Sequence, residues 1–511
     1  MPLAANQPGA SLATEHYDLV VIGGGINGCG IARDAAGRGY SVLLCEQHDL
    51  GAHTSSASTK LIHGGLRYLE HYQFSLVRKA LQERERLLRS APHLIRPLQF
   101  ILPHAPGMRP EWMLRAGLFL YDHLAPRELL PDSAAVNLRD HPAGAALHSD
   151  LARGFVYSDG WVDDARLVVC VARDAAGRGA RIRTRTTCVG AQRGSDAWEV
   201  HLQAADGTAT TVRSRSVINA AGPWVETLLR GALGVPPRRH LRLVKGSHIV
   251  VPALFDHPFA YLFQAAAGRV IFAIPYQRRF TLIGTTEIDF SGDPAAAAIT
   301  SAETEYLCAQ ANRFLARPVC RADVVWSFAG VRPLLDDANA GAGAVTRDYA
   351  LDLDRQGAPL MTVFGGKLTT FRKLSEEVVD KLQPVLGGRG AAWTATEAAT
   401  LPGGAIAHAD FDRWVAAVSA RHAWCPADLL GRWLAAYGTC VDDLLGDARS
   451  LDDLGCEVAP GLYAAELRYL RAMEWAQTAD DILWRRSKLG LHYSAAQRAA
   501  VDAWLNSHGG D

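Results

Sequence analysis

The sequence predicts an α/β protein that combines a parallel sheet with an antiparallel sheet and ends in an all-helical domain. Three features of the 511-residue chain lead to this prediction. Two short apolar runs flank a glycine-rich segment near the N-terminus, and the middle of the chain is rich in Val, Ile, Thr and aromatic residues with turn residues at short spacing. From Asp410 onward, Leu, Ala, Arg and Trp recur at helical spacing, and glycines become few.

The first predicted unit is a strand, a helix and a second strand within about 30 residues, the length of one βαβ unit. The runs Asp18–Ile22 and Ser41–Glu46 are almost wholly apolar, which is typical of strands buried on both faces of a parallel sheet. The helix is expected over Ile26–Gly37. The segment Arg33–Gly39 recurs identically at Arg173–Gly179. Because a glycine often ends a helix before the next strand, we expect two equivalent helix-to-strand junctions.

A glycine motif between these two strands predicts a dinucleotide site of the Rossmann type. Its residues are Gly23, Gly25 and Gly28. The first permits a tight turn, the second lets the backbone approach a pyrophosphate, and the third allows close packing of the helix on the strand. Glu46 ends the second strand, 18 residues after Gly28, where a carboxylate can accept a hydrogen bond from a ribose hydroxyl. Glu46 also disfavours NADP, but this motif does not separate NAD from FAD.

Two further glycine-rich segments favour FAD over NAD. Asn219–Trp224 follows the short strand Val217–Ile218, and Phe364–Thr370 opens a helix near the end of the α/β region. Each could by itself be a structural turn. Several distant segments of this kind are expected together where one long cofactor, with adenine, pyrophosphate and isoalloxazine, extends through a whole domain.

The composition excludes several classes of function. The chain carries 53 Lys and Arg and 53 Asp and Glu, a formal net charge of zero, whereas nucleic-acid-binding proteins usually carry a basic excess. Nine cysteines without a CxxC pair indicate neither a disulfide framework nor a zinc site, so we expect no metal. No apolar run is long enough for a spanning helix, and Met1–His16 lacks the pattern of a signal peptide. We therefore expect a cytoplasmic enzyme.

The domain organisation is expected to have three parts. These are a flexible leader over residues 1–16, a FAD-binding and interleaved substrate-binding domain over residues 17–395, and a helical domain over residues 396–511. The regions with the clearest patterns are Asp196–Phe290 for the antiparallel sheet, and Ala464–Ala476 and Asp480–Leu489 for helices.

Long sequence runs along nearly the whole chain carry a family resemblance. They are Asp18–Tyr40, Thr54–Tyr72, Lys245–Val251, Ile283–Phe290, Ala329–Asp337 and Phe364–Leu374, with Leu401–Ala405 and Asp480–Gly490 in the tail. The sequence resembles the FAD-dependent glycerol-3-phosphate dehydrogenases of respiration. The resemblance implies oxidation of sn-glycerol 3-phosphate to dihydroxyacetone phosphate, with electrons passing from FAD to a membrane quinone. It also implies a two-domain flavoprotein fold of the glucose-oxidase-like type, followed by an all-helical C-terminal domain.

The resemblance also implies which residues bind substrate and cofactor. A phosphate monoester needs fixed positive charge, and the planar fork of arginine suits its oxygens. The expected substrate-binding residues are Arg67, Tyr68, Arg332, Arg347 and Lys367. The cofactor-binding residues expected beside Gly23, Gly25, Gly28 and Glu46 are Thr54, Ser55, Ser58, His63, Gly64, Gly65, Ala221, Gly222, Gly366, Leu368 and Thr369.

The expected reaction is hydride transfer from substrate C2 to flavin N5, coupled to loss of the C2 hydroxyl proton. We expect His248, Lys367 and Arg332 to be the catalytic residues. His248 is the preferred proton acceptor, since a neutral histidine can accept a proton near neutral pH, and His63 and Lys367 compete for this role. Lys367 could equally stabilise the reduced flavin or hold a substrate oxygen. A histidine that enters an apolar strand is, however, often only a core residue.

Quinone is lipid-soluble, so a chain without a spanning helix must reach it from the membrane surface. Met108–Leu130 is the expected docking segment, because its apolar and aromatic residues alternate with Arg109, Arg115 and Arg127. A core helix or a dimer-contact helix is the alternative. We therefore expect peripheral association with the inner face of the cell membrane, and a homodimer stays open.

Other functions also stay open at the level of the sequence. The same fold could serve a glycerol-3-phosphate oxidase that uses oxygen, an amine or amino-acid oxidase, or a flavin-bound sensor without turnover. The phosphate-binding arginines disfavour the amine and the sensor. The sequence does not separate oxygen from quinone as the electron acceptor.

Overall fold

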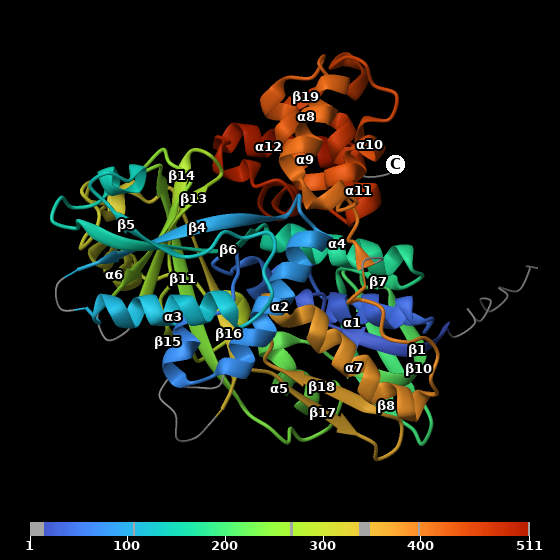
Figure 1. The fold of residues 1–511 in the computed structure, drawn as a ribbon. Helices are drawn as coiled ribbons and strands as arrows, with labels where there is room; N and C mark the ends of the chain where they lie inside the picture. The colour runs from blue at the N-terminus through green and yellow to red at the C-terminus, as the bar shows by residue number, and fades with distance from the viewer. Residues whose placement is uncertain (1–14, 106–107, 266–268, 337–347, 397–398, 509–511) are drawn as a thin grey trace, which may run out of the picture.

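The computed structural model describes residues 15–105, 108–265, 269–336, 348–396 and 399–508. These residues form two large sheets and a C-terminal group of helices (Figure 1). Most of the expected leader, residues 1–16, lies outside the described residues. The first strand begins at Glu15, two residues before Tyr17, because Glu15 and His16 already pair with Val212 and Arg213.

The first sheet has eight strands in the described part of the chain and is parallel at its centre. Its parallel strands, in spatial order, are β18 (Leu360–Phe364), β10 (Ala209–Asn219), β1 (Glu15–Ile22), β2 (Val42–Cys45) and β7 (Arg181–Arg183). Three antiparallel strands flank them, namely β17 (Ala350–Asp354) beside β18, β9 (Trp198–Ala204) beside β10 and β8 (Thr186–Arg193) beside β9.

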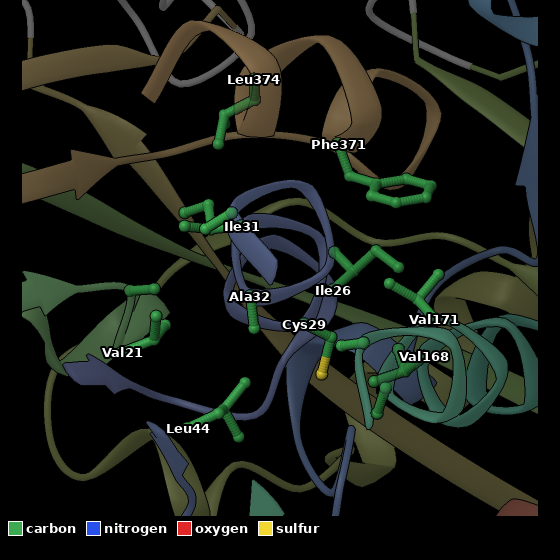
Figure 2. Packing of buried hydrophobic residues seen from close by; sticks show 14 of the residues in the cluster. Val21, Ile26, Cys29, Ile31, Ala32, Leu44, Val168, Val171, Phe371 and Leu374 are labelled. Carbon is green, nitrogen blue, oxygen red and sulfur yellow. The ribbon is translucent and has the colours of Figure 1, made fainter. Parts of the chain in front are cut away.

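Strand β1 is buried on both faces, as its apolar sequence predicts. Leu19 and Val21 belong to a core beneath helices α1 (Ile26–Gly37), α4 (Asp164–Gly177) and α7 (Phe371–Leu386). Val20 belongs to a second core with β8–β10 and α5 (Val225–Arg230) on the other face. Figure 2 shows α1 in the middle of the first core, surrounded by Val21 and Leu44 of the sheet, Val168 and Val171 of α4, and Phe371 and Leu374 of α7.

The repeated segment forms two equivalent junctions, as expected. One copy ends α1 and the other ends α4, and both leave the helix through a glycine with positive φ, +90° at Gly39 and +97° at Gly179. The strands that follow, β2 and β7, are parallel neighbours. Arg33 of the first copy also pairs with Asp174 of the second at 2.5 Å, so the two junctions lie against each other.

The second sheet has ten strands among the described residues and is mostly antiparallel. They are β3 (Leu61–Ile62), β4 (Ile95–His104), β5 (Ala134–Asn137), β6 (Arg153–Val162), β11 (Leu241–Pro252), β12 (Ala260–Gln264), β13 (Val270–Tyr276), β14 (Phe280–Gly284), β15 (Ile288–Asp289) and β16 (Trp326–Leu335). Helices α3 (Glu111–His123) and α6 (Ser301–Ala311) lie beside this sheet in Figure 1, and α2 (Phe74–Ser90) lies near the middle of the view, where it contacts β4 and β6.

The antiparallel sheet was predicted over Asp196–Phe290, but its extent differs from that prediction. The start of this region, β9 and β10, belongs to the first sheet, while β3–β6 and β16 join the second sheet from outside the region. Alternating apolar and polar residues mark an antiparallel strand without showing which sheet it enters, so the pattern could not separate the two.

The C-terminal helices form a core of their own, which agrees with the helical spacing of the sequence. Their elements are α8 (Phe411–Arg421), α9 (Ala427–Tyr437), α10 (Val441–Leu445), α11 (Ala464–Glu474), the π-helix η13 (Asp481–Arg486) and α12 (Ala495–Ser507). Trp433, Leu467 and Ile482 are fully buried among them. The group is not wholly helical, because β19 (Glu457–Ala459) and β20 (Leu462–Tyr463) form a small hairpin. In Figure 1 this group covers α4 and one end of the second sheet.

Across the residues that the structure describes, no helix has both the length and the apolar character needed to cross a membrane.

Candidate active site

The glycine-rich segments meet at one edge of the first sheet. Gly23 follows β1, Ala220 follows β10 and Gly365 follows β18, and the carboxyl ends of parallel strands lie at the same edge. Asn27 at the start of α1 donates a hydrogen bond to the Gly365 carbonyl at 3.2 Å. Segments 338 positions apart in the sequence thus form one continuous surface.

Glycine is required at the first turn for steric reasons. Gly23 has a φ of +115°, and a Cβ at Gly28 would lie 1.9 Å from the Gly23 carbonyl oxygen. The first observation shows the tight turn that the motif predicts, and the second shows close packing of α1 on β1. Gly28 therefore shapes the turn from behind and is not among the described residues that line a cavity here.

Two adjoining cavities run along this edge. They share Gly25, Thr54, Ser55, Ala220, Gly222 and Pro223. The first cavity extends to the second sheet, and the predicted residues that line it are Gly25, Thr54, Ser55, Ser58, His63, Gly65, Arg67, Tyr68, Gly222, Arg332, Gly366, Lys367, Leu368 and Thr369. The second extends toward β2, and the predicted residues that line it are Gly23, Gly25, Glu46, Thr54, Ser55, Ala221 and Gly222.

Glu46 organises the far end of the second cavity. Its Oε2 accepts a hydrogen bond from Gly24 N–H at 2.7 Å and its Oε1 accepts one from His48 N–H at 2.8 Å. Burial raises the pKa of this carboxyl above its ordinary value. His53 lines the same cavity with its ring edge against Trp224, and burial lowers the pKa of His53 to about 4. This end of the site combines the Glu46 carboxyl with the rings of His53 and Trp224, which suits a ribose and its adenine.

Residues 54–58, which lie where the two cavities meet, are fixed by hydrogen bonds to three other elements. Ser55 Oγ accepts a hydrogen bond from Ile26 N–H, the first donor of α1, at 3.0 Å. Thr54 Oγ1 donates to the Val331 carbonyl of β16 at 2.7 Å, and Ser58 Oγ donates to Asp164 of α4 at 2.7 Å. The N-terminal end of α1 is thereby placed where an anionic pyrophosphate would be stabilised by the helix.

Two arginines from different elements converge in the first cavity. Arg67 Nη1 lies 3.9 Å from one carboxylate oxygen of Glu287, and Arg332 Nη1 lies 3.8 Å from the other. Arg332 also donates to Thr285 Oγ1 at 3.1 Å. Lys367 adds a third cation beside them, with its ammonium 4.4 Å from the centre of the Tyr68 ring.

Four of the five predicted substrate residues thus come together at one end of the first cavity. The fifth, Arg347, lies outside the described residues.

His248 lies one layer behind the cavity wall. Its side chain is buried, its ring stacks on Phe328, and its Nε2 is 3.0 Å from Thr59 Oγ1. Thr59 lines the first cavity, whereas His248 is not among the described residues that line it. Burial, followed by the charges of Arg332 and Lys60, holds the pKa of His248 well below its ordinary value.

Two other predicted residues take different positions. His63 lines the cavity, and its backbone N–H donates to Thr369 Oγ1 at 3.3 Å. Gly64 lies deeper, where its N–H donates to Tyr121 Oη at 2.8 Å and a Cβ would meet Leu81 at 2.4 Å. Gly64 therefore shapes the loop and does not line either cavity in the described part of the chain.

The structure adds site residues that the sequence did not single out. Thr59, Thr285 and Glu287 line the first cavity, and so does Asn27. Thr285 and Glu287 lie within the run Ile283–Phe290 that carries the resemblance, so the run pointed to this region without assigning a role. Glu287 lies between the two arginines because η2 (Leu66–His71), β16 and the end of β14 pack together. The sequence alone does not show this arrangement.

The residues present fit FAD. The two cavities together form a long trough, with Glu46 and the aromatic residues around it at one end and a helix N-terminus in the middle. The turns at Gly23 and Gly366 leave room where a side chain would collide, since a Cβ at Gly366 would lie 2.5 Å from Asn27 Nδ2. A dinucleotide whose second ring system reaches the cations of the first cavity matches this shape and donor set.

Comparison with known proteins gives consistent matches over both parts of the chain. Residues 18–372 match the family model of the FAD dependent oxidoreductases, and residues 394–507 match the C-terminal domain of alpha-glycerophosphate oxidase. A glycerol-3-phosphate dehydrogenase of Pseudomonas aeruginosa is 51% identical over 98% of this chain and 97% of its own. A D-erythritol 1-phosphate dehydrogenase of Brucella abortus is 47% identical over 96% of this chain and 98% of its own.

Solved structures agree with these matches. The glycerol-3-phosphate dehydrogenase from Bacillus halodurans, solved in complex with FAD, superposes with a TM-score of 0.77 at 28% identity and covers 96% of this chain and 90% of its own. The fold, the trough and the sequence relatives lead to one assignment. The chain belongs to the FAD-dependent oxidoreductases, within the family of FAD-dependent glycerol-3-phosphate dehydrogenases.

Proposed function

We propose that this protein oxidises sn-glycerol 3-phosphate to dihydroxyacetone phosphate and passes the electrons to a quinone at the membrane surface. The observation that carries the proposal is the convergence of Arg67, Arg332 and Lys367 at one end of a FAD-shaped trough. A phosphate dianion at this point would meet two guanidinium forks and an ammonium group. Glu287, whose side chain is 11% exposed, would keep the two forks aligned before the substrate enters.

When bound, FAD supplies the hydride acceptor. The chain's own residues hold the substrate by its phosphate and take up the proton that the C2 hydroxyl loses. Thr59 lines the cavity and contacts His248, so we propose that the hydroxyl of Thr59 passes this proton to the Nε2 atom of neutral His248. The substrate thus loses one hydride and one proton and becomes a ketone. His63, on the cavity wall, is the competing proton acceptor.

A second candidate substrate is a longer polyol phosphate. The Brucella relative is named a D-erythritol 1-phosphate dehydrogenase and is 47% identical to this chain, close to the 51% of the glycerol-3-phosphate dehydrogenase. Both substrates present a phosphate and a secondary hydroxyl, so the arginine pair would serve either. Only the room beyond the reacting carbon would separate them.

An exposed apolar patch supports contact with a membrane. We define it by Trp112, Met113, Phe119 and Leu120 of α3 and by Tyr72 and Phe74 at the start of α2. Trp112 is 69%, Phe119 63% and Tyr72 81% exposed, whereas monomeric proteins expose few clustered large apolar side chains. The opposite face of α3 is packed, with Leu118 and Tyr121 buried. A core helix therefore explains only one face of α3.

The patch is connected to the substrate cavity through η2. Arg109, before α3, pairs with Glu70 of η2 at 3.1 Å, and η2 also carries Arg67 and Tyr68. A quinone held at a membrane beneath this patch would thus lie near the element that carries Arg67 and Tyr68. We propose peripheral docking on the inner face of the cell membrane through this patch.

The expected role of Arg127 at the membrane is not supported by its surroundings. Its side chain is 6% exposed and pairs with Asp122 at 2.8 Å. Arg127 therefore serves the fold, and Arg109 and Arg115 are the arginines that stay candidates for contact with lipid headgroups.

The central test is anaerobic reduction of the bound flavin. Glycerol 3-phosphate should bleach the flavin absorbance faster than D-erythritol 1-phosphate at equal concentration, and glycerol without phosphate should leave the absorbance unchanged. The reduced enzyme is then mixed with a soluble quinone or with oxygen, and faster reoxidation by quinone is expected. If D-erythritol 1-phosphate reduces the flavin faster than glycerol 3-phosphate does, the second substrate is the correct one. Reduction of the flavin by an amine would overturn the proposal.

Arg332→Ala should weaken substrate binding. Loss of a charge-assisted contact costs roughly 1.5–3 kcal/mol, which raises KM about tenfold to a hundredfold if the contact supplies ground-state binding. The measurement is steady-state kinetics with glycerol 3-phosphate. Arg355→Ala, on the exposed turn between β17 and β18, is the matched control and should leave KM unchanged. An unchanged KM in Arg332→Ala would remove Arg332 from the phosphate site.

His248→Ala should slow flavin reduction by roughly 10²–10⁴-fold, the usual contribution of a positioned acid or base, while FAD stays bound. Burial, Arg332 and Lys60 hold the pKa of His248 well below 6.5, so its neutral form persists as pH falls through that value. The reduction rate of the wild-type enzyme, measured by stopped-flow, should therefore show no inflection near that pH.

His257→Ala, which replaces a half-buried histidine in the loop between β11 and β12, is the control for the His248 variant and should reduce its flavin at the wild-type rate. An inflection near the ordinary histidine pKa, together with a fast His248→Ala variant, would assign the role to His63.

Replacing two large residues of the patch should weaken vesicle binding. An apolar side chain that enters the membrane contributes about 1.5–3 kcal/mol of binding free energy. The double variant Trp112→Ser/Phe119→Ser should therefore bind anionic liposomes at least about tenfold more weakly in a sedimentation assay. The control is Val189→Ser/Met473→Ser, which removes two exposed apolar side chains outside the patch. If both double variants bind vesicles as the wild type does, the patch is not the docking surface.

A further inference from the structure

We propose that the C-terminal domain holds the FAD-lining part of the chain in its binding conformation, through a cluster of basic residues directed at Asp49. None of the described residues after 395 lines either cofactor cavity. The domain would therefore act on the cofactor through another part of the chain. That part is residues 46–60, called here the cofactor-lining segment. The inference rests on FAD as the cofactor and is independent of the substrate proposed above.

The cofactor-lining segment forms much of the wall of both cavities. Glu46, His48 and His53 line the second cavity. Thr54 and Ser55 line both cavities, and residues 57–59 line the first. No α-helix or regular strand covers this stretch, since its one element is the short 3₁₀ turn Thr54–Ser56. A segment of this kind depends on side-chain contacts for a fixed shape.

Asp49 is the anchor on the first half of the segment. It directly follows His48 of the cavity wall, is itself not among the described residues that line either cavity, and has a side chain that is 1% exposed. Arg486 donates to both carboxylate oxygens at 2.7 Å, in the bidentate geometry of the strongest ion pairs. Arg485 Nε donates to the same carboxylate at 2.5 Å. Three hydrogen bonds from the C-terminal domain thus end on one buried acid.

The π-helix η13 brings the two arginines to this acid. Arg485 and Arg486 are adjacent, and adjacent residues on a regular α-helix do not face the same direction. In η13, the Ser487 N–H instead bonds to the Ile482 carbonyl five residues earlier, at 2.9 Å. Such wider turns are frequent at functional sites, and here the turn lets both side chains reach Asp49.

A second contact reaches the other half of the segment. Lys488, buried just after η13, pairs with Asp163 at 3.2 Å. The next residue, Asp164, accepts hydrogen bonds from Ser58 Oγ at 2.7 Å and from Lys60 Nζ at 2.8 Å. Lys60 in turn donates to the Ser56 carbonyl at 3.0 Å. The tail residues 485–488 therefore support the segment at both of its halves.

Arg485, Arg486 and Asp49 are positioning residues in this proposal. Asp49→Asn removes the charge at nearly constant volume, and Arg485→Gln removes one of the two arginines while the Arg486 fork stays. Each should speed the release of FAD from the holoenzyme on dilution, measured by recovery of flavin fluorescence. We expect the rate of FAD release to rise roughly tenfold or more. Residues that orient the binding groups of a metal site have effects of this size when they are replaced. With saturating FAD, the KM for glycerol 3-phosphate should stay near the wild-type value.

Arg173→Gln is the matched control. Arg173 of α4 contacts the same C-terminal domain, through Tyr469 Oη at 2.5 Å and Glu474 at 3.6 Å, and these contacts lie outside the cofactor-lining segment. It should lower the thermal unfolding temperature without changing the rate of FAD release. If Asp49→Asn and Arg485→Gln both release FAD at the wild-type rate, or if Arg173→Gln speeds release as much as they do, the proposal is wrong.

A measurement on the wild-type chain covers the case in which the variants do not fold. A tail that holds the segment in its FAD-binding form must itself be stabilised when FAD binds, because the coupling between two sites is reciprocal. Amide hydrogen exchange in residues 477–491 should therefore be slower in the holoenzyme than after release of FAD. Equal exchange rates in the two forms would overturn the proposal.

Discussion

The whole site depends on the parallel register of three strands at the centre of the first sheet. Because β1, β10 and β18 run in the same direction, their carboxyl ends bring three distant glycine turns to one edge. A long anionic cofactor needs backbone donors and free space along its length, and this edge provides both. The second sheet then only has to present cations at one end of the trough, where Arg332 of β16 lies near Arg67 of η2.

Local features of the sequence predicted the parts of the structure that depend on local geometry. The Gly23 turn, α1, the repeated junctions and the helical tail follow from glycine placement and apolar spacing within short windows. The membership of the two sheets could not be predicted, because strand alternation does not say which neighbour a strand takes. For the same reason Thr59 and Glu287 were missed, and His248 was expected at the cavity but lies behind it. Each of these depends on contacts between strands far apart in the sequence.

Although the chain has a net charge of zero, its arginines and acidic residues are arranged in specific pairs. In the first cavity, Arg67 and Arg332 lie 3.9 Å and 3.8 Å from Glu287, longer than a direct hydrogen bond. Elsewhere, buried arginines pair directly with acids, such as Arg372 with Glu83 at 2.6 Å and Arg486 with Asp49 at 2.7 Å. Buried pairs of this kind add little net stability compared with apolar packing, but losing one partner is costly. They therefore favour one arrangement of the chain over others.

The chain passes repeatedly between the two sheets, and this has a consequence for biosynthesis. Strands β3–β6 enter the second sheet before β7–β10 complete their part of the first, and β17 and β18 return to the first sheet only after β16. The second sheet cannot be complete before residue 335 has left the ribosome, nor the first before residue 364. Until then, unpaired strand edges are exposed, and non-local pairing of this kind is slow and prone to aggregation. A nascent chain of this protein is therefore expected to benefit from chaperones that shield such edges.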